Sequence, residues 1–200
     1  MFLFAFTRRV RHGSRAVVAL FTLVALSITT IQAANAAADH NKHMSMATPG
    51  MAIQLLPQAL GTYEWKVSTD NAEAQAFFNQ GMQLRWAYNM PESVASMVRA
   101  RELDPTCAMC FWGEAFSRGS FLNGGMSAEQ AAAARVAIQQ ANQLKANSSA
   151  MERALIEAAL VRYPEGYDPD ERRLIDQAFA DAMAKVYREY SNNHDVAAVY

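Results

Sequence analysis

The stretch from Phe77 to Pro105 constrains the fold most, because apolar and small residues recur in it with helical spacing. Phe77, Gly81, Leu84 and Tyr88 follow one another at intervals of four, three and four residues. This spacing places all four on one face of an α-helix. The first part of the stretch therefore predicts an amphipathic helix.

A second helical pattern follows after a short turn. It has small or apolar residues at Ser93, Met97 and Ala100, and Pro105 ends it. Glycine in a helix interior costs about 1 kcal/mol relative to alanine. The position of Gly81 therefore predicts that the second helix approaches closely, at Ser93 and Met97. The stretch as a whole predicts two antiparallel helices joined by a tight turn.

Helix start patterns recur along the rest of the chain. In a capping box, a capping residue is followed three positions later by Glu or Gln. Such pairs occur at Asp70/Glu73, Ser127/Gln130, Ser149/Glu152 and Asp168/Glu171. Helices are predicted near residues 70–88, 91–103, 106–118, 128–145, 150–163 and 169–190, with a last one beginning near 195. No segment is typical of a strand and the connections are short. We therefore expect an all-α fold of antiparallel helix-turn-helix units.

The N-terminal region has the pattern of an export signal. Four arginines precede an apolar run at residues 16–31, and Ala34 to Ala36 form an A-x-A site. The run is shorter than the ~20 residues of a membrane-spanning helix. We therefore expect residues 1–38 to be a signal peptide, cut after Ala36 or Ala38, rather than a membrane anchor. Residues 39–68 are then a linker or N-terminal tail, with one short helix near 53–60, before a helical domain at 69–200.

Export changes the charge of the chain and its environment. The sequence has 18 Lys and Arg and 19 Asp and Glu, and cleavage would remove four arginines and no acid. The exported protein would then be mildly acidic, which disfavours nucleic acid and anionic membranes as partners. We expect a periplasmic or secreted protein with no membrane insertion after cleavage.

The helical pair resembles the tetratricopeptide repeat. That signature has an aromatic residue, a glycine, small residues and a closing proline at the spacing of residues 77–105, with Ser93 in place of Ala and Met97 in place of an aromatic. A weaker second unit begins at Met109 and has Gly113 and Phe116 at matching positions. The resemblance implies an α-solenoid of stacked helix pairs.

The chain also resembles one exported bacterial tetratricopeptide family, whose function is largely unassigned, over residues 69–200. The resemblance lies in the segments 78–81 and 103–115, in the pairs Glu152-Arg153 and Arg162-Tyr163, and in Tyr187 near Tyr190. Asn89-Met90-Pro91 departs from the Asn-His turn of that family. Its members are longer and have more repeats, so the resemblance implies an N-terminal portion or a truncated member, incomplete at the C-terminus.

Carried over to this chain, the resemblance implies a binding groove lined by the first helix of the pair. The groove residues would be Gln75, Phe78, Met82, Arg85 and Trp86. Arg85 beside Trp86 could take a carboxylate together with an apolar side chain. The alternative is that Phe78 and Trp86 pack beneath the segment at residues 39–69.

Two cysteines stand three apart at a predicted helix start, Cys107 and Cys110. This spacing permits a disulfide, which export would favour. A redox dithiol is the alternative, because a helix N-terminus lowers a thiol pKa. Thioredoxin-like enzymes, however, place such a pair in a βαβ unit, and no histidine follows it to suggest haem attachment. A structural role is the favoured interpretation, either as a local disulfide or as two small buried residues.

Residues His40 to Met46 gather imidazole and thioether groups just after the predicted cleavage site. Both groups suit copper, but a solvated tail explains the composition as well. The sequence thus predicts an exported scaffold that binds a protein or peptide, neither an enzyme nor dependent on a cofactor. A redox or copper-handling protein that uses Cys107 and Cys110 or the His40–Met46 tail is the alternative, and a non-functional remnant is a third reading.

Overall fold

A computed structural model describes residues 53–56 and 60–200. The predicted signal peptide and the His40–Met46 tail lie outside these residues. The helices are α2 (Ala72–Trp86), α3 (Met90–Leu103), α4 (Ala108–Arg118), α5 (Ala128–Leu144), α6 (Ala150–Leu160), α7 (Arg172–Glu189) and α8 (His194–Val199), with short 3-10 turns at Lys145–Asn147 and Pro169–Glu171. The described part contains no strand, only an isolated bridge between Phe121 and Gly124. The predicted all-α class is confirmed.

The helix starts follow the local sequence closely. Ser127 and Ser149 form complete capping boxes with Gln130 and Glu152, as predicted. The predicted cap at Asp70 is wrong by one residue. The side chain of Asn71 accepts hydrogen bonds from the first turn of α2 instead, because the helix begins at Ala72 and Asn71 precedes it.

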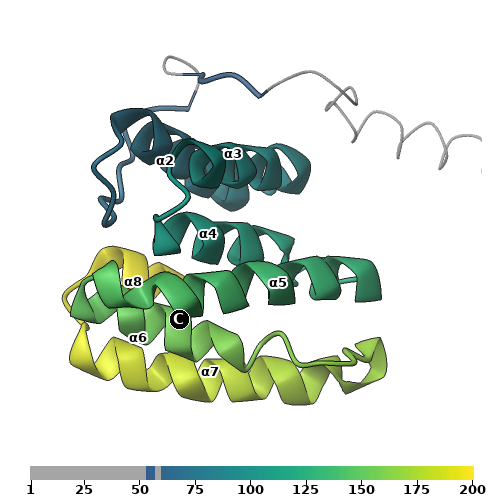
Figure 1. The fold of residues 1–200 in the computed structure, drawn as a ribbon. Coiled ribbons are helices and arrows are strands. Elements are labelled where there is room, and N and C mark those ends of the chain that lie inside the picture. Colours follow the sequence, from purple (N-terminus) through teal and green to yellow (C-terminus); the bar gives the residue numbers. More distant parts are fainter. Residues whose placement is uncertain (1–52, 57–59) are drawn as a thin grey trace, which may run out of the picture. The chain divides into compact units, whose positions relative to one another are not determined.

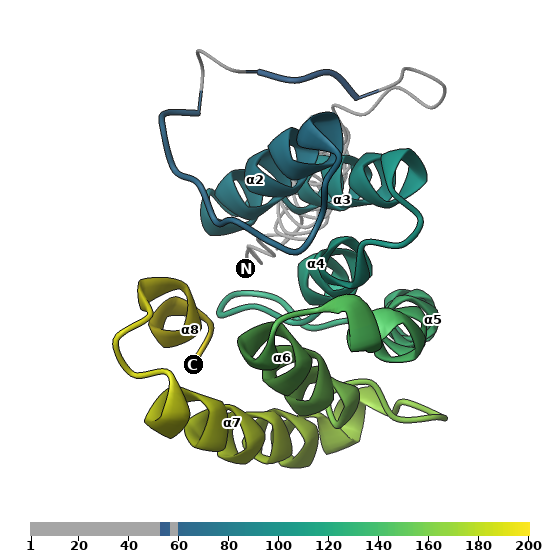
Figure 2. The ribbon, with the colours of Figure 1, turned by 60° about the vertical axis from the view of Figure 1, so that its left-hand side comes forward.

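Helices that follow one another in the chain pack together in three pairs: α2 with α3, α4 with α5, and α6 with α7. Figure 1 shows these pairs as successive layers, and α3 and α5 also contact the first helix of the next pair. The first helices of the pairs contact one another as well, α2 with α4 and α4 with α6. In Figure 2, the first helices α2, α4 and α6 lie on the side of the stack that is turned toward α8.

Met97 of α3 is held between two glycines, and it is fully buried. A Cβ at Gly81 would lie 2.7 Å from the Met97 methyl carbon, and a Cβ at Gly113 would lie 2.5 Å from the Met97 sulfur. Ser93 donates a hydrogen bond to the carbonyl of Gly81 at 2.7 Å. The close approach predicted at Gly81 is therefore confirmed, and Gly113 repeats it on the other side of the same side chain.

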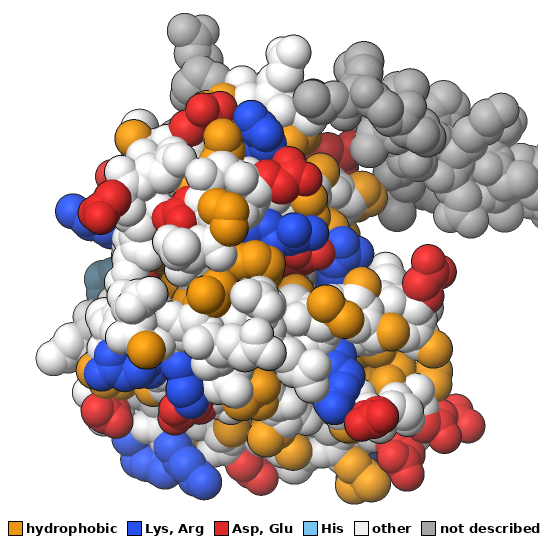
Figure 3. All heavy atoms as spheres, in the orientation of Figure 1, with side chains coloured by type: hydrophobic (Ala, Val, Ile, Leu, Met, Phe, Trp, Pro, Cys, Tyr) orange, Lys and Arg blue, Asp and Glu red, His pale blue; other side chains and the backbone are white. Residues whose placement is uncertain are grey.

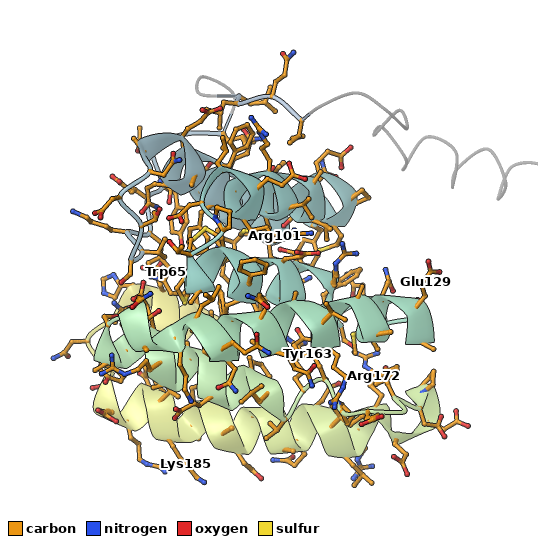
Figure 4. All side chains as sticks on the ribbon, in the orientation of Figure 1. Trp65, Arg101, Glu129, Tyr163, Arg172 and Lys185 are labelled. Atoms are coloured by element: carbon orange, nitrogen blue, oxygen red, sulfur yellow. A yellow bond between two sulfur atoms is a disulfide. The ribbon has the colours of Figure 1, made fainter. Side chains whose placement is uncertain are left out.

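The segment before α2 differs from the expected linker. Residues 60–69 contain no helix, and Trp65 and Val67 are buried. Trp65, labelled in Figure 4, meets the ring of Phe78 edge-on at 5.9 Å and the ring of Trp112 at 5.6 Å. The segment therefore contributes to the core.

Four carboxamide side chains of α2 form hydrogen bonds with the backbone of this N-terminal segment. They belong to Gln75, Asn79, Gln80 and Gln83. Gln75 accepts from the N–H of Val67 at 3.0 Å and donates to the carbonyl of Trp65 at 2.9 Å. Gln80 pairs in the same way with the N–H of Leu56 and the carbonyl of Gln54. The short helix predicted near 53–60 is absent at residues 53–56, because these backbone groups bind Gln80 instead.

Candidate functional site

The five predicted groove residues lie in three different environments. Phe78 and Met82 are completely buried, and Gln75 is bonded to the backbone of the chain's own N-terminal segment. Arg85 is buried at 6 % exposure, whereas Trp86 is 38 % exposed. In this conformation a partner can therefore reach Trp86, but not Phe78 or Met82.

Arg85 meets a second buried arginine, Arg162, which follows α6 and is 8 % exposed. Both guanidinium groups donate to the carbonyl of Ser120, Arg85 at 3.0 Å and Arg162 at 2.7 Å. Arg85 also contacts the sulfur of Met90 at 2.8 Å. The Ser120 carbonyl thus brings together two cations that are far apart in the sequence.

These two cations have no acidic partner among residues 53–56 and 60–200. No carboxylate in the part of the chain that the structure describes lies within 4.0 Å of either guanidinium. The Nε of Arg162 is buried and has no hydrogen-bond acceptor. The two donor nitrogens share one oxygen at 3.0 and 2.7 Å, so they are at most about 5.7 Å apart. Like charges at about that separation repel each other by roughly 3 kcal/mol at an effective dielectric constant of about 20. The arrangement is therefore rich in unmatched positive charge.

Aromatic faces supply part of the compensation. The guanidinium carbon of Arg85 lies 4.8 Å from the centre of the Phe116 ring, and that of Arg162 lies 4.6 Å from the Phe179 ring. Ring faces attract cations through their quadrupole. Burial nevertheless lowers the pKa of Arg85 to about 10, and the neighbouring Arg162 adds to this effect. Arg85 remains charged at neutral pH.

A pocket of about 220 Å³ opens at this pair. Its lining comes from α2, the turn into α3, α4, the loop after α4, the residues after α6, α7 and α8. The lining residues are Arg85, Trp86, Tyr88, Met90, Phe116, Phe121, Leu122, Arg162, Phe179, Ala198 and Val199. Figure 2 shows the loop reaching from the α4–α5 layer toward α8. Trp86, Tyr88 and Leu122 are exposed and form the rim. We call this hollow the arginine pocket.

The sequence identified Arg85 and Trp86 but missed Arg162. Arg162 and Tyr163 entered only through a family resemblance, without a role. Both side chains are buried, and the Tyr163 hydroxyl donates to the carbonyl of Ala115 at 2.7 Å. The useful signal would have been that Arg162 is buried without an acidic neighbour. Arg162 lies in a loop, where no periodic pattern reveals burial, so the sequence could not give this signal.

Cys107 and Cys110 form a disulfide at the start of α4. The two residues are 1 % and 0 % exposed. Exchange requires a thiolate to reach a disulfide sulfur, so burial opposes it. This environment favours a structural role for the bond.

A second, open hollow of about 1100 Å³ lies beside residues 66–71, the turn after α3 and the start of α6. Glu152, one of its lining residues, is buried and accepts from the N–H groups of Ser68 and Ser149, each at 2.7 Å. Its carboxylate also accepts from the Ser68 hydroxyl. These bonds join the N-terminal segment to α6, so Glu152 has a structural role.

Among residues 53–56 and 60–200, no cluster of His, Cys, Asp or Glu could hold a metal ion. No helix in the same residues has both the length and the apolar content to cross a membrane. On the face drawn in Figure 3, acidic and basic side chains are interspersed, and neither sign forms a continuous patch. The arginine pocket is therefore the site with the most distinctive chemistry.

Comparison with protein-family models, with curated proteins and with solved structures gave no match.

Proposed function

We propose that the chain is an exported scaffold of tetratricopeptide-like helix pairs that binds a segment of another protein. The observation that carries this proposal is the alternation of contacts along the chain. Each helix packs on the next, while α2, α4 and α6 also contact one another on one side. In an α-solenoid, this alternation creates a continuous inner face on which partners dock.

The glycine positions support the same proposal. Gly81 in α2 and Gly113 in α4 both lie against Met97 of the helix between them. Small residues at equivalent places in successive first helices are what a repeat architecture needs for close packing. The first helices of two pairs thus both pack closely on α3, each through a glycine.

The partner surface that we propose is the rim of the arginine pocket. Trp86, Tyr88 and Leu122 are 38 %, 55 % and 83 % exposed there, and they come from the end of α2, the turn into α3 and the loop after α4. Aromatic residues near one another on a surface are typical anchors of protein interfaces. Of the other predicted groove residues, Gln75 and Phe78 contact the N-terminal segment, Met82 is buried and Arg85 lines the arginine pocket, so among the five only Trp86 is on the exposed rim.

The test is affinity capture from the producing cells with the tagged chain, compared with Trp86→Ala and Val136→Ala variants. Val136 is 69 % exposed on α5 and does not line the pocket, so it is the matched control. We expect one protein to be captured by the unaltered chain and by Val136→Ala but lost with Trp86→Ala, and to bind again after purification. A folded chain that captures nothing specific would refute the scaffold.

Export is tested separately by the mass and location of the chain in cells. We expect a chain outside the cytoplasm that begins at Ala37 or Asp39. A full-length chain in the cytoplasm would refute export but would leave the scaffold intact.

A further inference from the structure

We propose that the arginine pocket binds a small organic acid, with its carboxylate between Arg85 and Arg162 and its apolar body against the surrounding rings. This site goes beyond the proposed docking of a protein segment on the rim. The proposal depends on three features: unmatched charge, free hydrogen-bond donors and the size of the pocket.

The charge argument comes first. Arg85 and Arg162 are both more than nine-tenths buried, and they share one neutral acceptor, the carbonyl of Ser120. Buried charges in proteins are normally paired with an opposite charge. Within the described residues neither arginine belongs to an ion pair. An anion at this position would relieve the repulsion that the fold otherwise leaves in place.

The donors favour a carboxylate. A guanidinium carries several N–H donors in a fixed plane that matches the two oxygens of a carboxylate. Arg162 uses one nitrogen on Ser120, and its buried Nε has no acceptor. The two terminal nitrogens of Arg85 donate to the carbonyl of Ser120 and to the sulfur of Met90, which is a weak acceptor. Both side chains therefore retain donor capacity beside the hollow.

The lining favours an apolar body on the acid. Phe116, Phe121 and Phe179 contribute ring surface to the pocket, and Leu122 and Val199 add aliphatic surface. The stacked pair of Phe116 and Trp112, with ring centres 5.0 Å apart, holds the Phe116 ring in place from the core side. A rigid apolar wall beside a pair of cations suits a ligand that is charged at one end only.

The size favours a small molecule. The volume of about 220 Å³ is below the roughly 300–1,000 Å³ of pockets for drug-sized ligands. It suits one ring with a short carboxylate arm. A peptide that ends in an apolar residue offers the same chemistry at its C-terminus, so the test must separate the two sources.

The test uses calorimetric titration of the purified chain with phenylacetate and with its neutral isostere, phenylacetamide. We expect phenylacetate to bind and the amide to bind at least about tenfold more weakly, because charge-assisted hydrogen bonds are lost. Binding of phenylacetate should weaken as salt concentration rises. Equal binding of acid and amide, or no binding of the acid, would overturn the proposal without any variant.

Arg162→Gln and Arg99→Gln then locate the site. The side chain of Arg99 on α3 is 41 % exposed, lies outside the pocket and forms a surface ion pair with Glu102, so it is the matched control. We expect at least about a tenfold loss of phenylacetate affinity in Arg162→Gln and no change in Arg99→Gln. Unchanged affinity in a folded Arg162→Gln variant would overturn the site. If that variant does not fold, the comparison of phenylacetate with phenylacetamide on the unaltered chain still tests whether the chain binds the acid through its charge.

A third arm compares the tripeptide Ala-Ala-Phe with its C-terminal amide. Binding of the free tripeptide without binding of phenylacetate would overturn the small acid in favour of a peptide terminus. If the unaltered chain captures no specific protein but still binds phenylacetate, the scaffold is refuted and the acid site is not. The two proposals therefore fail separately.

Discussion

Replacing Gly113 with alanine tests the packing rule that joins α2, α3 and α4. The new Cβ would lie 2.5 Å from the sulfur and 2.9 Å from the methyl carbon of Met97, and 3.2 Å from the Phe78 ring. Met97 cannot move away freely, because on its other side it already contacts the backbone of Gly81. The methyl group must therefore be accommodated by a shift of a helix.

The expected magnitude follows from two opposing effects. Alanine gains about 1 kcal/mol of helix propensity over glycine. Overpacking a filled core costs typically 1–3 kcal/mol, and a side chain confined on both sides places this site near the upper end of that range. We expect a net loss of roughly 2 kcal/mol in the free energy of unfolding. For a domain of this size, that loss lowers Tm by about 4–8 °C.

The assay is urea unfolding followed by circular dichroism, with Gly125→Ala as the matched control. A Cβ at Gly125 meets only the end of the Arg172 side chain, at 3.7 Å, and the φ of Gly125 is not in the left-handed region. We expect Gly125→Ala to be neutral or stabilising by up to about 1 kcal/mol. If Gly113→Ala behaves like Gly125→Ala, the close approach to Met97 is refuted.

A double-mutant cycle isolates the contact itself. Met97→Ala alone should cost about 2–5 kcal/mol, because it leaves a cavity. In the Gly113→Ala background the cavity admits the added methyl group, so the combined loss should fall short of the sum by at least about 1 kcal/mol. Strict additivity would contradict a direct contact between these residues.

Three further predictions concern contacts that join separate elements. Glu114→Gln should lower the free energy of unfolding by about 1–3 kcal/mol in urea titrations, because the buried carboxylate accepts from Arg101 at 2.5 Å and Arg118 at 2.8 Å; no change would refute the network. Tyr63→Phe removes a 2.7 Å hydrogen bond to Asp195 and should cost about 1 kcal/mol. Burial, and next the contact with Asp195, raises the pKa of the Tyr63 hydroxyl above its ordinary value. The stability that this hydroxyl contributes is therefore complete below the pKa of tyrosine in the unfolded chain, about 10, and is lost as the pH rises above that value. Stability should therefore fall less steeply above that pH in Tyr63→Phe, and identical slopes would contradict the linkage. Replacing Cys107 and Cys110 by serine should cost about 2 kcal/mol through loop entropy but leave the helices folded, and alkylation of the native protein in mild glutathione should find no free thiol.

Local sequence determined the helices of this protein. Capping residues such as Ser127 and Ser149, the apolar periodicity and the prolines act within a few residues of where they stand, so they predicted each helix to within a few positions. The contact between Gly81 and Met97 was also predictable, because a helical hairpin brings residues at this separation together in only one way.

The tertiary structure alone decided the rest. The sequence of the N-terminal segment predicts a linker, since Trp65 and Val67 give no periodic pattern. Contacts with distant elements, such as the carboxamides of α2 and the carboxylate of Glu152, hold it in the core. In the same way, nothing local in the sequence connects Arg85 with Arg162. The two side chains meet because α2, the loop after α4 and the residues after α6 come together at the carbonyl of Ser120. A contact between residues so far apart depends on how whole helices pack rather than on local preference.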